Sequence, residues 1–281
     1  MPKIAVVTDS TAYIPADLRQ KYGILMAPQQ VIWGTETFQD GVTMTPTQFY
    51  QRMRVDKTNP KTSQVSPGIF KEYFERALQN AEAVLCLTIS SNLSQTFNSA
   101  NVAKNDLPGA TLEVVDSQTI AMALGFLSIA AAKAAAEGQS MEAIKQMVVN
   151  SIANTGVVFV VDTLDYLHRG GRIGGASRFM GNLLNVKPVL HVKDGKVDAL
   201  ERVRTKKKAI DFMIEQISAK VAGKRNLRLA TLHADAEAEA KELLETAAKR
   251  LGAVEKVIAE VSPTVGAHTG PGTVGLAWMT D

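Results

Sequence analysis

Hydroxyl, amide and carboxylate side chains follow three predicted strands at the points where those strands end. The three segments are Thr8-Asp9-Ser10-Thr11, Ser90-Ser91-Asn92-Leu93-Ser94 and Asp116-Ser117. In an open α/β sheet the loops beyond the carboxyl ends of the strands form the ligand crevice, so we expect these segments to converge at one edge. Each segment alone is typical of turns and helix caps. Together they predict a polar ligand site.

A fourth polar group, Thr62-Ser63-Gln64, lies in a predicted loop before a helix that Ser66 caps. Ser94 stands where another predicted helix begins with Gln95 and Thr96. The first turn of a helix leaves backbone N–H groups free and carries the positive end of the helix dipole. Because an anion is stabilised at such a point, the sequence predicts that a carboxylate binds near Ser94.

His268 is the histidine whose setting favours contact with a ligand. It lies in Gly266-Ala267-His268-Thr269-Gly270-Pro271-Gly272. We expect this segment to be a loop in which the main chain passes close to a ligand. An imidazole there could donate to an oxyanion and titrate near neutral pH. His168, His191 and His233 are expected to be structural or surface residues.

Several classes of enzyme lack their usual signatures in this sequence. The segment from Gly270 to Gly275 matches G-x-G-x-x-G, but the six residues after Gly275 leave no room for a βαβ unit. The chain has no G-x-x-x-x-G-K-[ST] phosphate loop, no H-E-x-x-H helix and no G-x-S-x-G elbow. We therefore expect no catalytic activity and no cofactor. The alternative is an acyl hydrolase or transferase that uses Ser94 and His268.

Two clusters of basic side chains could bind a phosphate group or a partner, or could form a solvated face. One is Arg169-Gly170-Gly171-Arg172 with Arg178, and the other is Arg202, Arg204 and Lys206 to Lys208. Few aromatic side chains interleave them and the net charge is only +3, which weighs against binding to nucleic acid. A regulatory protein that acts through Arg202 to Lys208 is a second alternative.

The composition is that of a folded globular protein. Of 281 residues, 46% are hydrophobic and 21% are charged, so a large core is possible and wholesale disorder is excluded. The single cysteine, Cys86, excludes an internal disulfide framework and a cysteine-rich zinc site, and we expect it to fill space in the core. Because no long apolar run occurs, we expect a cytoplasmic protein with at most transient membrane contact. We also expect no metal site.

Short β-branched runs alternate with amphipathic segments over the first 160 residues, as in parallel strands joined by helices. The predicted strands are Lys3 to Thr8, Ala83 to Ile89, Thr111 to Val115 and Val157 to Val161. Further along, Val186 to Val192 and Val197 to Val203 flank Asp194-Gly195, a strong hairpin signal.

These elements predict an α/β protein of two lobes. Residues 1–160 are expected to form an α/β domain with a parallel sheet. Residues 161–281 are expected to form an α+β domain with a β-hairpin and helices. The C-terminal tail is free to pack back toward the ligand site.

Across essentially its whole length the sequence resembles the DegV proteins, a family of bacterial fatty-acid-binding proteins. The matching segments are Thr8-Asp9-Ser10, Thr62-Ser63-Gln64, Ser90 to Thr96, Leu167 to Ile173, Asn185-Val186-Lys187-Pro188, Arg204-Thr205, and His268 with Gly270-Pro271-Gly272. The sequence departs from the family at Gln95, where Gly is common, and at Phe97, where Tyr is frequent.

The resemblance implies a long-chain fatty acid held between the lobes, with its tail in an apolar tunnel and its carboxylate bound by Thr62, Ser94 and His268. It also implies supporting ligand loops, which contain Asp9, Ser10, Ser63, Ser91, Gln95, Thr269 and Gly270. Better-studied members present the acid to a separate ATP-dependent fatty acid kinase, which makes an acyl-phosphate for phospholipid synthesis. Arg172 and Arg204, with Arg202 as a neighbouring alternative, would then guide kinase docking or steady the phosphoryl group.

Overall fold

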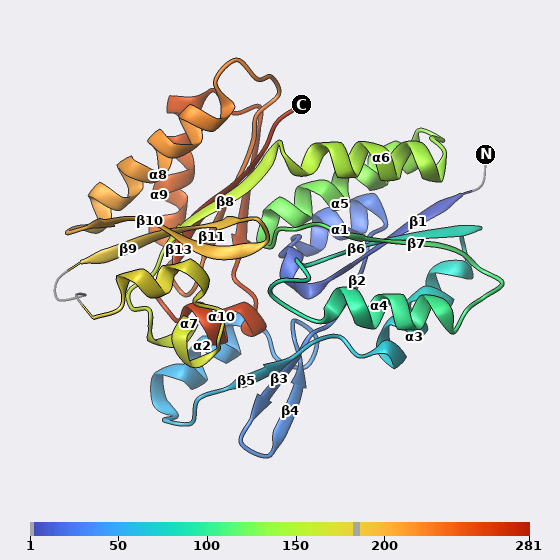
Figure 1. The fold of residues 1–281 in the computed structure, drawn as a ribbon, viewed down its shortest axis with the longest axis horizontal. Helices are drawn as coiled ribbons and strands as arrows, with labels where there is room; N and C mark the ends of the chain where they lie inside the picture. The colour runs from blue at the N-terminus through green and yellow to red at the C-terminus, as the bar shows by residue number, and fades with distance from the viewer. Residues whose placement is uncertain (1–2, 182–185) are drawn as a thin grey trace.

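The computed structural model describes residues 3–181 and 186–281, and within them helices cover two large β-sheets while a small third sheet projects at one side (Figure 1). Asn185, which belongs to one of the family segments, lies outside the described residues. The first sheet is parallel and has the strand order β2-β1-β6-β7. Its strands are β1 (Ile4–Asp9), β2 (Leu25–Ala27), β6 (Ala83–Thr88) and β7 (Thr111–Asp116). The predicted parallel α/β unit is therefore confirmed.

Helices cover both faces of this first sheet. On one face lie α3 (Pro67–Leu78) and α4 (Thr96–Asn105), and Phe70, Phe74 and Cys86 share a core there. The other face packs against α5 (Ala121–Ala136), which lies beside α1 (Ala16–Tyr22) and α6 (Met141–Ile152). Cys86 is buried, as predicted, and this burial raises the pKa of its thiol well above the usual value.

The second sheet has the strand order β10-β9-β8-β13-β11-β12. Its strands are β8 (Thr155–Val160), β9 (Lys187–Lys193), β10 (Lys196–Val203), β11 (Arg228–His233), β12 (Glu255–Glu260) and β13 (Val274–Met279). Two helices, α8 (Lys206–Val221) and α9 (Glu237–Leu251), cover one face. The antiparallel pairing of β9 with β10 confirms the hairpin predicted at Asp194-Gly195.

The strand predicted at Val157 to Val161 belongs to this second sheet rather than to the N-terminal one. β8 pairs antiparallel with β13 on one side and with β9 on the other. The expected boundary after residue 160 would assign β8 to the domain of the first sheet. In the described residues β8 pairs with no strand of that sheet. The apolar pattern of a strand indicates burial on both faces, but it does not identify the strands that pair with it.

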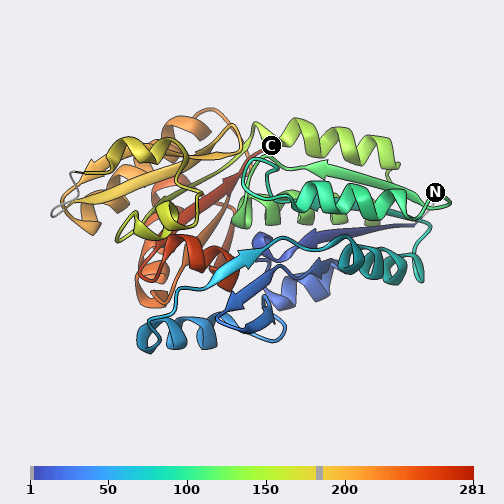
Figure 2. The same cartoon turned by 60° about the horizontal axis from the view of Figure 1, so that its bottom comes forward.

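A small third sheet was not predicted, and it carries Thr62. Its strand order is β4-β3-β5, with both pairs antiparallel, and the strands are β3 (Gln30–Trp33), β4 (Glu36–Gln39) and β5 (Lys61–Ser63). Thr62 therefore lies in a short strand and not in the predicted loop. Figure 2 brings this sheet forward, together with α2 (Pro46–Val55). Strands of three or four residues leave too short an alternating pattern to detect.

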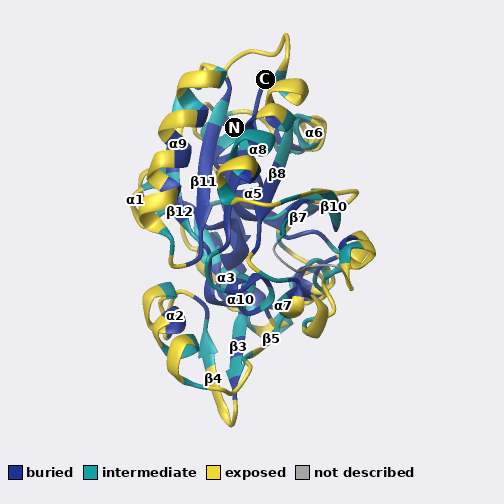
Figure 3. Cartoon of the chain, turned by 90° about the vertical axis from the view of Figure 1, so that its left-hand side faces the viewer, coloured by how far each residue is buried: buried dark blue, intermediate teal, exposed yellow. Residues whose placement is uncertain are grey.

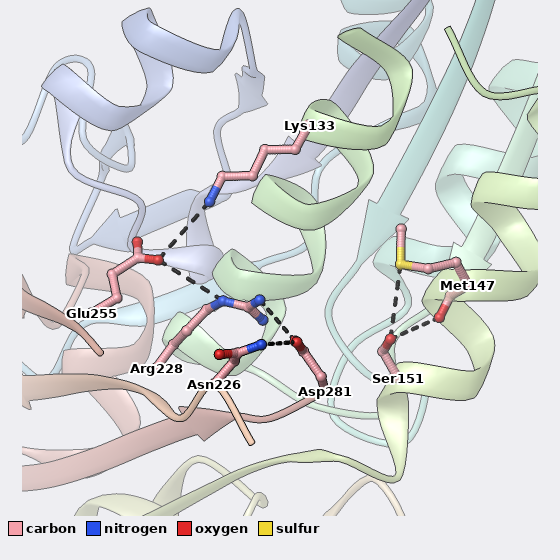
Figure 4. A network of polar contacts seen from close by, with 7 residues as sticks. All are labelled: Lys133, Met147, Ser151, Asn226, Arg228, Glu255 and Asp281. Carbon is pink, nitrogen blue, oxygen red and sulfur yellow. Dashed lines mark hydrogen bonds and ion pairs between the residues drawn. The ribbon is translucent and has the colours of Figure 1, made fainter. Parts of the chain in front are cut away.

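Helix α5 joins the two large sheets into one core. Most of its side chains are alanine or other apolar residues and are buried, and they pack between β1 of the first sheet and β13 of the second. Figure 3 shows the buried strands inside and the exposed helix faces outside. At the edge of this core, Lys133 of α5 lies 3.9 Å from Glu255 of β12, which also faces Arg228 of β11 (Figure 4).

Gly125 tests how closely α5 packs against the first sheet. A Cβ at this position would lie 2.8 Å from the backbone oxygen of Ala12, just after β1. We expect Gly125→Ala to lower the free energy of unfolding by about 1–3 kcal/mol, although alanine favours the helix. Urea unfolding provides the measurement. Gly68→Ala, at an exposed position of α3, is the matched control, because its Cβ would meet nothing closer than 4.0 Å. Equal effects of both changes would contradict the close packing.

Candidate functional site

A cavity of about 900 Å³, including space open to solvent, lies where the two large sheets meet. Its walls are mainly apolar and come from separate parts of the chain: Ile89 and Leu93 after β6, Val157 and Phe159 on β8, and Val192 and Val197 beside the hairpin turn. A mainly apolar cavity with a few polar groups is typical of small-molecule binding sites.

Thr62, Arg172 and His268 stand where this cavity meets a second, outer pocket. All three residues line both spaces. Lys61, Arg169 and Tyr166 also line the outer pocket, whereas no carboxylate is found among its described lining residues. The inner cavity is therefore lined mainly by apolar surface, and positive charge gathers at its mouth.

Thr62 and His268 form a hydrogen-bonded pair at this mouth. Thr62 Oγ1 and His268 Nε2 are 2.8 Å apart, although the two residues are far apart in sequence. His268 lies in the last turn of α10 (Pro263–Thr269), and not in a loop as the glycines predict. Pro263 is the first residue of the helix, and Gly270, whose φ of +76° suits glycine, is its C-cap.

Burial keeps the His268 imidazole neutral. Burial and, to a smaller extent, the positive charge of Arg172 lower the pKa of the ring from its usual value to about 4. Among the described residues Nδ1 has no hydrogen-bond partner. The backbone at Gly170 packs on that side, where a Cβ would come within 2.0 Å of Nδ1. The first glycine of the Arg-Gly-Gly-Arg segment is therefore required by the ring that it covers.

Ser94 lines the same cavity, just before α4. The helix begins at Thr96 with Gln95 as its N-cap, one residue later than predicted. Ser94 Oγ accepts from the Thr96 N–H at 3.3 Å and lies 2.8 Å from Thr96 Oγ1. The structure thus brings Thr62, Ser94 and His268 to one cavity, as the family resemblance implies.

The buried carboxylate of Asp9 holds the converging loops together. Its oxygens accept from Ile89 N–H at 2.7 Å, from the hydroxyl of Thr11 at 2.6 Å and from Gln29 Nε2 at 3.3 Å. Burial raises the pKa of this carboxyl above its usual value, and the hydrogen bonds from these donors oppose the rise. The predicted convergence of the loops after β1 and β6 is confirmed. Asp116 similarly accepts from the Ser91 N–H, after β7.

The predicted supporting residues divide between the cavity wall and the framework behind it. Ser63 and Thr269 line the cavity. Ser10 is buried behind the wall and donates to Asp40 at 2.8 Å. Ser91, Gln95 and Gly270 do not appear among the described lining residues: Gln95 is exposed, and Gly270 packs against the Tyr166 ring. The departure from the family at Gln95 therefore lies outside the cavity.

The basic residues also divide into two groups. Arg172 is at the mouth, where its guanidinium donates to the Leu93 carbonyl at 3.1 Å and to the Gly170 carbonyl at 2.8 Å. Arg202 and Arg204 are exposed and stand outside the cavity lining, and Arg202 lies over the Phe179 ring at 5.1 Å. Only Arg172 of these three can act directly on a group at the cavity mouth.

Sequence reasoning missed several residues of the site. Tyr13 and Gln29 line the inner cavity, and Lys61 lines the outer pocket. Gln29 lies between two short strands, and no local pattern marks it. Tyr13 has a left-handed backbone with φ of +56°, which a sequence does not reveal for a tyrosine. A search for polar residues beside the family segments would have found Lys61, which precedes Thr62.

Ser94 and His268 do not form the nucleophile–base pair that the alternative hydrolase or transferase would use. His268 bonds Thr62 and Ser94 bonds Thr96, and the described residues give no hydrogen bond between Ser94 and His268. A serine nucleophile needs a base within hydrogen-bond reach. Residues 3–181 and 186–281 hold no group of three or more His, Cys, Asp or Glu side chains placed to bind a metal. None of their helices is long and apolar enough to cross a membrane.

The fold and site define a class: an α/β protein whose two large sheets enclose an apolar cavity with a polar mouth. The sequence matches the model of a family described as "Uncharacterised protein, DegV family" over residues 3–281. The chain therefore belongs to the DegV family.

Individual relatives agree with this assignment over nearly their full length. A DegV domain-containing protein of Streptomyces coelicolor is 38% identical over 276 residues, which are 97% of each chain. The structure of a DegV family protein from Thermus thermophilus, described by its fatty acid binding, has a TM-score of 0.91 and 37% identity and covers 99% of this chain and 100% of its own. DegV of Bacillus subtilis, described as a fatty acid binding protein, has a TM-score of 0.92 and 33% identity, with both chains covered completely.

The ionisation of His268 provides a test of the site's electrostatics. Because its pKa in the folded protein is about 4, the ring should stay neutral from pH 8 down to pH 5. The unfolded chain takes up that proton near pH 6.5, so this residue's contribution to stability falls by roughly 3 kcal/mol as the pH decreases from above 6.5 to below 4. NMR of the ring resonances, assigned with His268→Gln, measures the titration. A midpoint at pH 6 or above would contradict the proposed enclosure of the ring.

Proposed function

We propose that this protein binds a long-chain fatty acid, with the hydrocarbon in the inner cavity and the carboxylate beside Thr62, Ser94 and His268. The observation that carries the proposal is the asymmetry of the cavity: its walls are mainly apolar, and the Thr62 hydroxyl, the His268 imidazole and the Arg172 guanidinium stand at its mouth, with Ser94 on the wall inside. The described binding of fatty acids by DegV proteins of T. thermophilus and B. subtilis supports it.

Hydrocarbon burial would supply most of the affinity. Each buried CH₂ group contributes about 0.8 kcal/mol, so a chain of sixteen carbons would gain far more from the cavity than from its head group. The head group would instead fix the ligand's orientation, because a carboxylate removed from water needs hydrogen-bond donors. Thr62 and Ser94 would donate hydroxyl hydrogens, His268 would act as a neutral partner, and Arg172 would provide positive charge nearby.

The bound acid can be sought directly. We expect native mass spectrometry or lipid extraction of the purified protein to find an acyl chain, and the delipidated protein to bind palmitate or oleate. Ser94→Ala and His268→Ala each remove a donor or its partner, and we expect each to weaken binding by about 1–3 kcal/mol. Ser218→Ala, on the exposed surface of α8, is the control and should leave the affinity unchanged. Absence of both a copurified chain and added-acid binding would refute the proposal.

We further propose that the protein presents this carboxylate to a separate ATP-dependent fatty acid kinase, which makes an acyl-phosphate. The basic outer pocket supports this step, because Lys61, Arg169 and Arg172 would face a phosphoryl group that forms on the carboxylate. Arg202 and Arg204 are exposed and are available for docking. The chain itself would then bind and orient the acid, and the kinase would supply the nucleotide chemistry.

The two roles of the basic residues can be separated. We expect Arg204→Ala to lower the rate of acyl-phosphate formation by such a kinase about tenfold or more, with unchanged palmitate affinity, because Arg204 lies outside the cavity. Arg172→Ala should lower both. Arg76→Ala, at an exposed position of α3, serves as the control for loss of a surface charge. Coupled kinase assays and equilibrium binding provide the measurements. A kinase rate that is insensitive to both changes would contradict the docking role.

A further inference from the structure

A chain of hydrogen bonds runs from Asp9 to Ser94 along the cavity wall. Gln29 Nε2 donates to Asp9 Oδ1 at 3.3 Å and to Thr96 Oγ1 at 2.9 Å, and Thr96 Oγ1 lies 2.8 Å from Ser94 Oγ. Asp9 and Thr96 are fully buried and Gln29 is 2% exposed. Thr96 is not among the described residues that line the cavity, so Ser94 is the member of this chain that stands between it and the cavity.

The amide of Gln29 has one orientation in this chain. Its neighbour Asp9 is a carboxylate with three further donors around it, so the NH₂ group, and not the amide oxygen, must face it. Both amide hydrogens are then used, one by Asp9 and one by Thr96. The Gln29 backbone is fixed as well, because its N–H donates to Ser10 Oγ at 3.1 Å. Gln29 can therefore present only a donor to Thr96.

The need for an acceptor for the Thr96 hydroxyl hydrogen favours one direction for the next hydrogen bond. Thr96 Oγ1 accepts from Gln29 and has one hydrogen of its own, and among the described residues Ser94 Oγ is the acceptor in reach. The Thr96 N–H also points to Ser94 Oγ, at 3.3 Å. Both lone pairs of Ser94 are thereby occupied. Its single hydroxyl hydrogen remains for a group inside the cavity.

We propose that Gln29 and Thr96 are positioning residues that fix Ser94 as a hydrogen-bond donor toward the cavity. The inference rests on the proposed fatty acid function and deepens it. A carboxylate can only accept hydrogen bonds, so a serine held as a donor matches it without reorientation on binding. A serine free to rotate would have to give up that freedom when the acid binds. Thr96 thus acts on the ligand through Ser94 and not by contact.

Removal of the Thr96 hydroxyl tests this inference. We expect Thr96→Val to weaken palmitate binding about three- to tenfold, because Ser94 loses the hydrogen bond that orients it. Thr96→Ser keeps the hydroxyl and should restore the affinity to within about twofold of wild type. Thr231→Val is the matched control, since Thr231 is a fully buried threonine of β11 whose hydroxyl has no partner among the described residues.

A double-mutant cycle with Ser94→Ala separates positioning from a general structural effect. In the Ser94→Ala background, Thr96→Val should cause no further loss of palmitate affinity, because the group that it positions is gone. An equal loss in both backgrounds, or no loss in a protein that Ser94→Ala does weaken, would overturn the inference. If Thr96→Val does not fold, by circular dichroism, Thr96→Ala enters the same cycle.

The same experiment distinguishes failure of the inference from failure of the proposed function. If the wild-type protein does not bind palmitate, the fatty acid proposal fails and the positioning role fails with it. If wild type binds palmitate and Ser94→Ala weakens binding, while Thr96→Val leaves the affinity unchanged, only the positioning role of Gln29 and Thr96 is wrong.

Discussion

The buried carboxylate of Asp9 is the constraint on which the site depends. A charge removed from water is costly unless donors surround it, and Asp9 obtains its donors from the segment after β1, from Ile89 after β6 and from Gln29 before β3. Satisfying this one group therefore brings three separate stretches of chain to the same sheet edge. Ser94 follows one of these stretches by a few residues, so its place in the cavity wall is a consequence of that convergence.

Elements outside the first sheet complete the site. Helix α10 carries His268 to the cavity mouth, and the small third sheet brings Thr62 to meet it. A charged imidazole would be unfavourable in this enclosed position beside Arg172, so the ring stays neutral and the guanidinium carries the positive charge. The cavity thus combines an apolar interior, formed by residues of both large sheets, with a mouth where hydrogen bonding and charge come from different groups.

Features that depend on neighbours in the chain were predictable from the sequence. Ser66 caps α3, the Thr45 capping box begins α2 with Pro46 in its first turn, and Asp194-Gly195 forms the hairpin turn. Each of these interactions is made within about four residues, so the residue types alone identify it. The sheet to which β8 belongs was not predictable, since β8 pairs with β13 about 120 residues away. In the third sheet β5 pairs with β3 across about 30 residues, and the local β3–β4 hairpin was missed because its strands are too short to show an alternating pattern.

The sequence by itself determined the α/β class, the caps and turns and, through its family pattern, the polar residues that gather at the cavity. Only the tertiary structure decided which of them lie together. Thr62 is hydrogen-bonded to His268, Gln95 lies outside the cavity, and Gln29 and Lys61 line the inner cavity and the outer pocket respectively. The physical reason is the distance along the sequence over which each interaction acts. Backbone capping and turn formation are local, whereas a cavity exists only where side chains from distant segments fail to fill the space between them.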